Sequence, residues 1–304
     1  MSTAVRATLS EQHAERRTQS LRPRFFGAVR GEILKITRQR ATWVMVGFAV
    51  LLLAIMFGAL ATEPNIKANL EQDPGGWYGL RLNVFTAVFN AGAGIFLLIL
   101  ASRLVAMEYS AGTIRVLLGR GTGRLQLLAA KLLTLLAVGL TLLAVFTLAA
   151  AVYVYATVSA MEGSFSLIAK LPNVWHDFEL SLLIAGVSIV INIVLATAAG
   201  VVGRSLAFGL GAALGFFPAD NFGTIVMTLL NRLTNQHIWR DVTAYLLGPN
   251  LNVFGSKLLP SQRAAFAQPL VPVDTTHVVV VIAVYAAIFL GLSIVLTARR
   301  DVLQ

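Results

Sequence analysis

The feature that most constrains the fold is a set of six long segments that are almost free of charge. A helix rises 1.5 Å per residue, so about 20 apolar residues cross the roughly 30 Å hydrocarbon core of a bilayer. Among the six segments only the fifth contains a charged residue, Asp220. The predicted spans are residues 42–62, 82–102, 132–157, 180–203, 205–231 and 277–298.

Composition agrees with a membrane protein and favours helices. Charged residues make up 12% of the 304-residue chain, whereas soluble domains contain roughly 25%. The apolar runs lack the alternation with a period of two that is typical of barrel strands. We therefore predict an all-α polytopic membrane protein with six transmembrane helices. Cysteine is absent, which excludes disulfides and thiolate metal sites.

The formal net charge of +10 is unevenly distributed along the chain. If the N-terminus is cytoplasmic and the spans alternate, 17 of the 24 Lys and Arg lie inside, whereas 9 of the 14 Asp and Glu lie outside. This is the positive-inside bias that sets membrane orientation. We expect a multi-pass protein of the cell membrane with both termini in the cytoplasm. The excess of basic residues then reflects the membrane topology, and nucleic-acid binding is not predicted.

The N-terminal region divides into two parts. Residues 1–23 are polar and predict a mobile cytoplasmic tail, and residues 24–304 are assigned to one transmembrane domain. Residues 24–40 combine a basic face with apolar residues at helical spacing, which favours an amphipathic helix in the headgroup plane. The alternative is a solvated basic extension of the first span. The apolar residues of this face are Phe26, Val29, Ile33 and Ile36.

Motifs for catalysis and metal binding are missing from the sequence. Residues 119–124 (GRGTGR) are rich in glycine but lack the Lys and following hydroxyl of a phosphate-binding loop. No HExxH or GxSxG motif occurs. We therefore predict that this chain is not an enzyme and has no catalytic, cofactor-binding or metal-ligating residue.

Polar residues follow one face of the second span and one face of the fourth. Within each span these residues are three or four positions apart, so they lie on the same side of a helix. Polar groups in lipid need partners, so both faces should contact protein or a water-filled path. Two interpretations stay open, helix packing and a translocation path. The residues proposed for the path are Asn83, Thr86 and Asn90 in the second span, Ser188 and Asn192 in the fourth, and Asp220 in the fifth.

The fifth span combines small residues with a proline. Ala207, Gly211, Gly215 and Ala219 are four residues apart and allow close helix approach. Pro218 is expected to break the helical hydrogen-bond ladder toward the outer side. The neighbouring Asp220 could line an outer gate or lie at the outer membrane interface.

The loop between the second and third spans resembles ABC-2 type transporter permeases, the membrane subunits of ABC exporters. In that family an acidic residue precedes Gly-Thr, a basic residue, a leucine-rich turn and a Lys opening the third span. The corresponding residues are Glu108, Gly112, Thr113, Arg115, Leu117, Leu118, Arg124 and Lys131. The basic amphipathic helix, six spans and proline in the fifth are similar too, so the resemblance covers about residues 24–304. Many members carry a proline where this chain has residues 119–123.

The resemblance implies an export permease in which two chains, identical or related, pair around a path. A separate ABC ATP-binding subunit would bind ATP and Mg, so this chain would hold no cofactor. A cytoplasmic coupling helix between spans two and three would dock into the ATPase. The resemblance assigns ATPase coupling to Glu108, Tyr109, Gly112, Thr113, Arg115, Leu117, Leu118, Arg120 and Arg124.

Two other functions remain possible on the sequence alone. An ion-gradient-driven secondary transporter usually carries ionisable residues near the membrane midplane. Here only Asp220 interrupts a span, and it lies off centre. The second alternative is an ATP-independent membrane scaffold.

Overall fold

The computed structural model describes residues 25–112, 122–161, 166–259 and 267–299. Within these ranges all regular elements are helices, and six of them are long and apolar enough to span a membrane. The predicted all-α, six-span architecture is confirmed. The six long helices are α3 (Arg40–Ala61), α5 (Pro74–Ser110), α7 (Arg124–Ala160), α9 (Val174–Gly203), α10 (Leu206–Thr234) and α13 (Thr275–Arg299).

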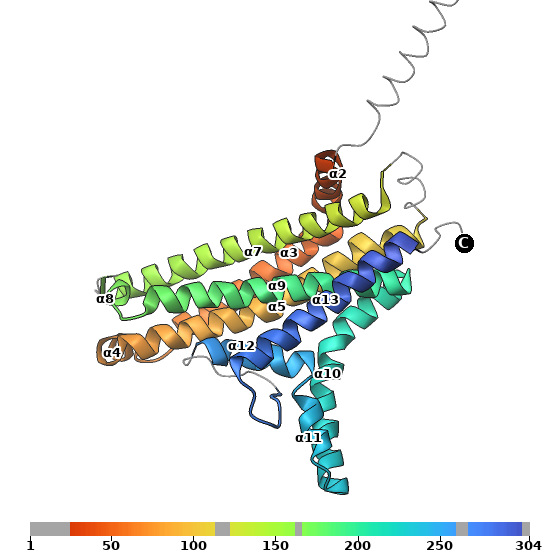
Figure 1. The fold of residues 1–304 in the computed structure, drawn as a ribbon. Helices are drawn as coiled ribbons and strands as arrows, with labels where there is room; N and C mark the ends of the chain where they lie inside the picture. Colours follow the sequence, from red (N-terminus) through yellow and green to blue (C-terminus); the bar gives the residue numbers. More distant parts are fainter. Residues whose placement is uncertain (1–24, 113–121, 162–165, 260–266, 300–304) are drawn as a thin grey trace, which may run out of the picture.

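Five shorter helices accompany the spans in the described residues. They are α2 (Phe25–Arg38), α4 (Ile66–Gln72), α8 (Ser166–Ala169), α11 (Ile238–Thr243) and α12 (Leu247–Leu258). In Figure 1, α2, the beginning of α7 and the end of α13 lie at one end of the bundle, and α4 and α8 lie at the other. We call these the α2 end and the α8 end. The predicted tail, residues 1–23, lies outside the described residues.

Helices α5 and α7 are much longer than the spans predicted for them. Each contains 37 residues, which corresponds to roughly 55 Å and exceeds the hydrocarbon core of a bilayer. The sequence prediction marked only the apolar part, whereas the backbone stays helical where the side chains become polar. Residues 124–131 therefore belong to α7, although the sequence analysis assigned them to a loop.

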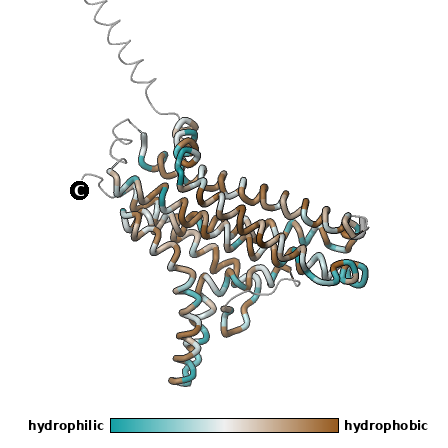
Figure 2. Tube along the Cα trace, turned by 180° about the vertical axis from the view of Figure 1, so that it is seen from behind, coloured by the Kyte–Doolittle hydropathy of each residue, from teal (hydrophilic) through white to brown (hydrophobic). Residues whose placement is uncertain are grey.

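The core of the bundle forms around α9, which packs against α5, α7, α10 and α13. Its fully buried Ile189 packs in one cluster with Leu97 of α5 and Leu135 of α7. The fully buried Ile191 belongs to a second cluster, with residues of α12 and α13. Figure 2 shows the helices of the bundle as predominantly hydrophobic, with hydrophilic residues mostly toward their ends. A Cβ placed on Gly139 would lie 2.6 Å from Ile189 Cγ2, so the approach of α7 to α9 requires a glycine there.

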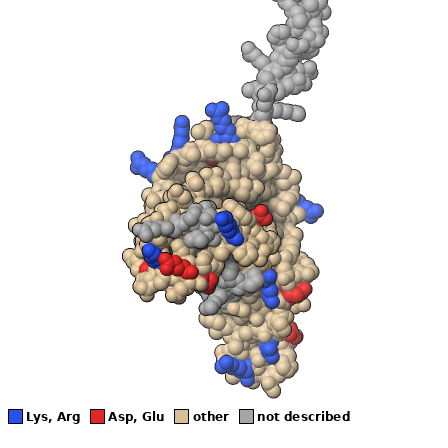
Figure 3. Space-filling model, turned by 90° about the vertical axis from the view of Figure 1, so that its left-hand side faces the viewer, with Lys and Arg blue, Asp and Glu red and all other residues tan. Residues whose placement is uncertain are grey.

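A second apolar cluster lies toward the α8 end, between α3, α4, α5, α7, α8 and α9. It contains the buried Trp77, Phe85 and Val154. Phe57 stacks on Tyr153 with 5.1 Å between ring centroids, and both rings adjoin Phe85. Figure 3 views the molecule from this side and shows acidic and basic side chains intermixed, with broad uncharged areas between them.

Helix α10 differs from the sequence prediction. It continues through Pro218 from Leu206 to Thr234, and Figure 1 shows it changing direction along its length and projecting from the bundle. A proline removes one backbone donor and kinks a helix without necessarily ending it. The expected break is therefore a bend. The long segment after α10 folds back as α11 and α12, and α12 packs on α10 and α13.

Helix α2 is amphipathic, but its apolar face is divided. Ile36 is buried, whereas Phe26 and Ile33 are exposed. The side that faces the bundle instead contains Glu32, a buried carboxylate. The apolar spacing did not reveal that Glu32, which lies between these residues, is buried against the bundle.

Candidate functional site

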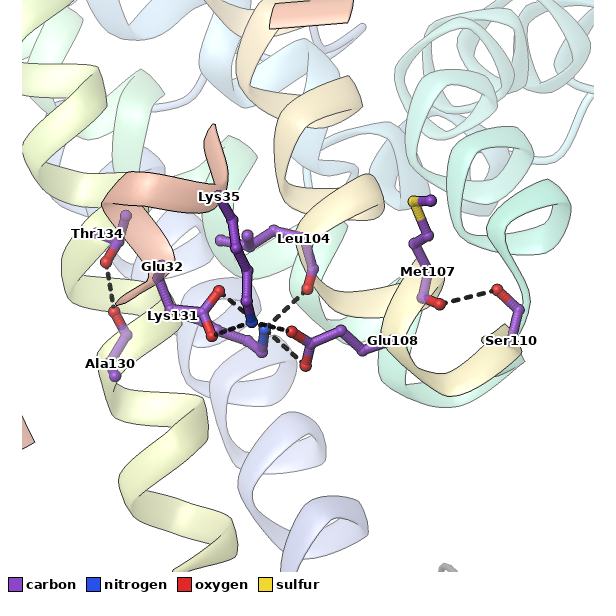
Figure 4. Close-up of polar contacts among 9 residues, drawn as sticks. All are labelled: Glu32, Lys35, Leu104, Met107, Glu108, Ser110, Ala130, Lys131 and Thr134. Carbon is purple, nitrogen blue, oxygen red and sulfur yellow. Dashed lines mark hydrogen bonds and ion pairs between the residues drawn. The ribbon is translucent and has the colours of Figure 1, made fainter. Parts of the chain in front are cut away.

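Four charged side chains from three helices meet at the α2 end of the bundle. We call Glu32 and Lys35 of α2, Glu108 of α5 and Lys131 of α7 the charge cluster. Figure 4 shows the two ammonium groups lying between the two carboxylates. The two acidic and two basic residues make the cluster neutral overall.

The ion pairs of the charge cluster connect all three helices. Lys35 Nζ lies 2.9 Å from Glu32 Oε1 and 2.5 Å from Glu108 Oε1. Lys131 Nζ lies 2.9 Å from Glu108 Oε2 and 3.2 Å from Glu32 Oε2. Lys131 also donates to the carbonyl oxygen of Leu104, at 2.9 Å. Each carboxylate therefore bridges both lysines, and α2 is tied to both α5 and α7.

Burial makes this arrangement sensitive to change. Glu32 is 2% exposed, Lys131 4% and Glu108 8%, whereas the side chain of Lys35 is 39% exposed. Burial alone would lower the pKa of Lys35, but hydrogen bonds and charge interactions with Glu108 and Glu32 outweigh it and raise the pKa above its ordinary value. A buried ion pair adds little net stability, but removing one partner costs about 3–5 kcal/mol. Loss of one of its buried members is therefore expected to destabilise the contact between the three helices.

The charge cluster brackets the segment that the sequence assigned to ATPase coupling. Glu108 lies in the last turn of α5, and Tyr109 beside it is half-buried. Gly112 has a φ of +66°, the left-handed conformation that glycine adopts without a Cβ clash. On the other side, Arg124 begins α7 and its Nη1 donates to the carbonyl oxygen of Ala298, at 3.4 Å.

Residues 113–121 lie outside the described part of the chain. The coupling residues concerned are Thr113, Arg115, Leu117, Leu118 and Arg120. Their predicted role, and the predicted coupling helix, stay predictions.

Sequence analysis missed the α2 half of the charge cluster. Glu32 lies three residues from Val29 and four from Ile36, so it falls on the apolar face of its own helix. A carboxylate on an apolar face is the pattern that could have revealed a buried partner. Lys131 was noticed only as part of the family resemblance.

The polar residues of the second and fourth spans lie at or near the contact between α5 and α9. Asn192 is buried and packs against α5, where a Cβ on Gly94 would lie 3.3 Å from its amide nitrogen. The same amide donates to the carbonyl oxygen of Ser188, at 2.7 Å. On α5, Asn83 and Asn90 are half-buried. These contacts describe packing; the path hypothesis stays a prediction.

Thr86 and Asp220 lie in different surroundings from one another. Thr86 is buried on α5, and its hydroxyl donates to the carbonyl oxygen of Leu82, at 2.8 Å. Asp220 is on α10 and accepts a hydrogen bond from the backbone N–H of Gly248 in α12. Its neighbour Asn221 accepts from Asn252 of α12, at 2.7 Å. The second half of α10 is thereby fixed to α12, and the proposed path residues do not form one cluster.

Comparison with known families identifies the family of this chain. The family model described as ABC-2 family transporter protein matches residues 28–218, more than half of the chain. The chain belongs to the ABC-2 transporter family. The match includes all four residues of the charge cluster. No curated protein is significantly similar to the chain.

Family membership fixes several functional properties of this ABC-2 protein. Membrane subunits of the family lack catalytic ATPase activity, so the prediction that this chain is not an ATP-hydrolysing enzyme is confirmed. Membership also implies an ABC ATPase as partner. The ABC-2 chain is a multi-pass membrane protein. Within the described residues, no three His, Asp or Glu side chains are grouped as metal ligands.

Proposed function

We propose that this ABC-2 permease couples ATP hydrolysis on a separate subunit to export, through the charge cluster. The observation that carries the proposal is the buried bridge from α2 to both helices that flank residues 113–121. Movement of that segment is transmitted to the end of α5 and the beginning of α7, which flank it in the sequence. Because the carboxylates are shared between two lysines, α2 must move with them.

In this mechanism the permease performs no chemistry. ATP and Mg²⁺ bind the partner ATPase, and closure of the ATPase subunits moves the segment that includes Leu117 and Leu118. The long α5 and α7 then tilt as rigid elements between inward-facing and outward-facing states. The segment and the charge cluster belong on the cytoplasmic side by the positive-inside bias. Both termini are then cytoplasmic.

A second permease chain completes the path in this proposal. The small residues Ala207, Gly211, Gly215 and Ala219 of α10 are all exposed on the single chain. Nothing lies within 4 Å of a Cβ built on Gly211 or Gly215. A row of small residues lets two membrane helices approach closely. We assign this row to contact with the second chain.

The coupling proposal is tested by adding charge to the apolar part of the segment. We expect Leu117→Asp with Leu118→Asp to abolish ATPase binding or transport-coupled stimulation, while membrane insertion stays normal. Hydrophobic anchors usually dominate interfaces, so this change should exceed the loss of any one exposed arginine. Copurification of the ATPase and substrate-stimulated hydrolysis in liposomes are the measurements.

The matched control is Leu125→Asp, an exposed leucine in the first turn of α7. An acidic residue is favourable at the first turn of a helix, so this variant should fold and couple normally. If the double variant binds and stimulates the ATPase like the unaltered chain, the segment does not couple, and the proposal is wrong.

A further inference from the structure

Helix α2 and the beginning of α3 present an exposed surface on the sides of α2 that face away from the charge cluster. Helix α2 packs on α7, and Figure 1 shows it running across the direction of the spans at the edge of the bundle. Glu32 faces the bundle, so residues on the other sides of the same helix face outward. We define the α2–α3 surface by the exposed residues Phe26, Arg30, Ile33, Arg38, Arg40 and Trp43.

The apolar part of the α2–α3 surface includes two strongly exposed aromatic rings. Phe26 is 77% exposed and Trp43 62%. The indole Nε1 of Trp43 donates to the carbonyl oxygen of Thr37, at 2.8 Å, so the ring lies at the corner between the two helices. Exposed Trp is typical of the headgroup level of a bilayer, where an apolar ring meets polar groups. The corner therefore belongs at the membrane–water interface.

The exposed apolar face continues from this corner along α3. Val44, Phe48 and Leu51 are three or four residues apart, and each is more than half exposed. Helix α3 is one of the helices long and apolar enough to span a membrane. An exposed apolar row on a span contacts acyl chains. Because the α2–α3 surface runs directly into this row, a bilayer lipid fits it better than a soluble protein does.

The charged part of the α2–α3 surface is entirely basic. Arg30, Arg38 and Arg40 are exposed, and within the described residues no ion pair or side-chain hydrogen bond involves them. Glu32 is the only acidic residue between positions 25 and 62, and it is buried in the charge cluster. Guanidinium groups match the geometry of phosphate oxygens. The charge of this surface thus complements an anionic phosphate group.

We propose that the α2–α3 surface binds an anionic phospholipid of the adjoining leaflet. Its phosphate accepts from Arg38 and Arg40, which flank the extended residue Gln39 between the two helices. Its acyl chain lies along Val44 and Phe48. Each Lys or Arg near an anionic membrane surface favours binding by about fivefold. Binding here needs no ATPase, so it can be tested separately from the coupling proposed above.

The test places a fluorophore beside the surface in the full chain, which contains no cysteine of its own. Gly47→Cys, an exposed position on α3 with open space around it, is labelled with bimane. The protein is reconstituted in phosphatidylcholine nanodiscs with increasing amounts of nitroxide-labelled phosphatidylglycerol or nitroxide-labelled phosphatidylcholine. We expect phosphatidylglycerol to quench the fluorophore at a mole fraction at least about fivefold lower. Added salt should reduce this preference.

Paired variants separate a specific contact from general attraction by a basic chain. Arg38→Gln with Arg40→Gln should make the two lipids quench equally. The matched control, Arg232→Gln with Lys257→Gln, removes two exposed cations elsewhere and should keep the preference. A fluorophore at Leu148→Cys, an exposed position on α7, should show no preference.

Three results would overturn the proposal. One is equal quenching by both lipids at Gly47→Cys in the otherwise unaltered chain, which would leave the surface to an occupant other than lipid. The second is a preference for phosphatidylglycerol that survives the loss of Arg38 and Arg40. The third is a preference of the same size at Leu148→Cys, which would show general enrichment of anionic lipid around the chain.

Discussion

Replacing Lys131 by Met should destabilise the protein far more than the same change at Lys35. Both lysines contact Glu32 and Glu108, so a list of ion pairs would rank them equally. Burial separates them, because Lys131 is 4% exposed and the side chain of Lys35 is 39% exposed. Methionine keeps the chain length and removes the charge at either position.

The expected magnitudes follow from what each change leaves behind. Without Lys131, two buried carboxylates share one half-exposed lysine, and the carbonyl of Leu104 loses its side-chain donor. Breaking a buried pair in this way costs about 3–5 kcal/mol. Without Lys35, the buried Lys131 still lies between both carboxylates, and loss of a partly exposed pair costs about 1 kcal/mol or less. The predicted difference is therefore about 2–5 kcal/mol.

The assay is reversible unfolding of the purified chain in mixed micelles, titrated with SDS and followed by circular dichroism. A third variant, Glu32→Gln with Lys131→Met, removes one charge of each sign and leaves the pair between Lys35 and Glu108. Because a neutral replacement of a buried ion pair is often tolerated, this double variant should recover most of the loss. Equal destabilisation by the two single Met variants, or a double variant no more stable than Lys131→Met, would refute the reasoning.

The remaining predictions concern packing, assembly and pH. Gly139→Ala should cost about 1–3 kcal/mol in the same unfolding assay because its Cβ meets Ile189, whereas Gly186→Ala, with open space around it, should be neutral or stabilising. In this cysteine-free chain, Gly211→Cys should form a disulfide-linked dimer in membranes. The control Leu140→Cys, at an exposed position on α7, should stay monomeric. Absence of the Gly211→Cys dimer would contradict the assigned contact between two α10 helices. The pKa of Lys35 is raised in the folded chain, so its stabilising contribution is complete below pH 10.5 and is lost at higher pH. Unfolding stability should fall above that pH more steeply in the unaltered chain than in Lys35→Met.

The amino-acid sequence alone was enough to predict the membrane class, the number of spans and the family resemblance. These follow from length and hydropathy, because each span must bury its own backbone hydrogen bonds in lipid whatever its neighbours are. The residues Glu108 and Lys131 could also be singled out, because they belong to a local pattern. Helix limits were less predictable, since α5 and α7 stay helical beyond the apolar segment that hydropathy detects.

Only the tertiary structure brought Glu32 and Lys35 to Glu108 and Lys131, from positions up to 99 residues apart. It also joined Arg81 of α5 to Glu63. Local spacing indicates which face of a helix is polar. It does not indicate which other helix supplies the hydrogen-bond or ion-pair partners of that face. A buried charge is tolerated only where another element supplies the opposite charge. The partners of Glu32 and Arg81 are therefore properties of helix packing, and no single segment of the sequence specifies them.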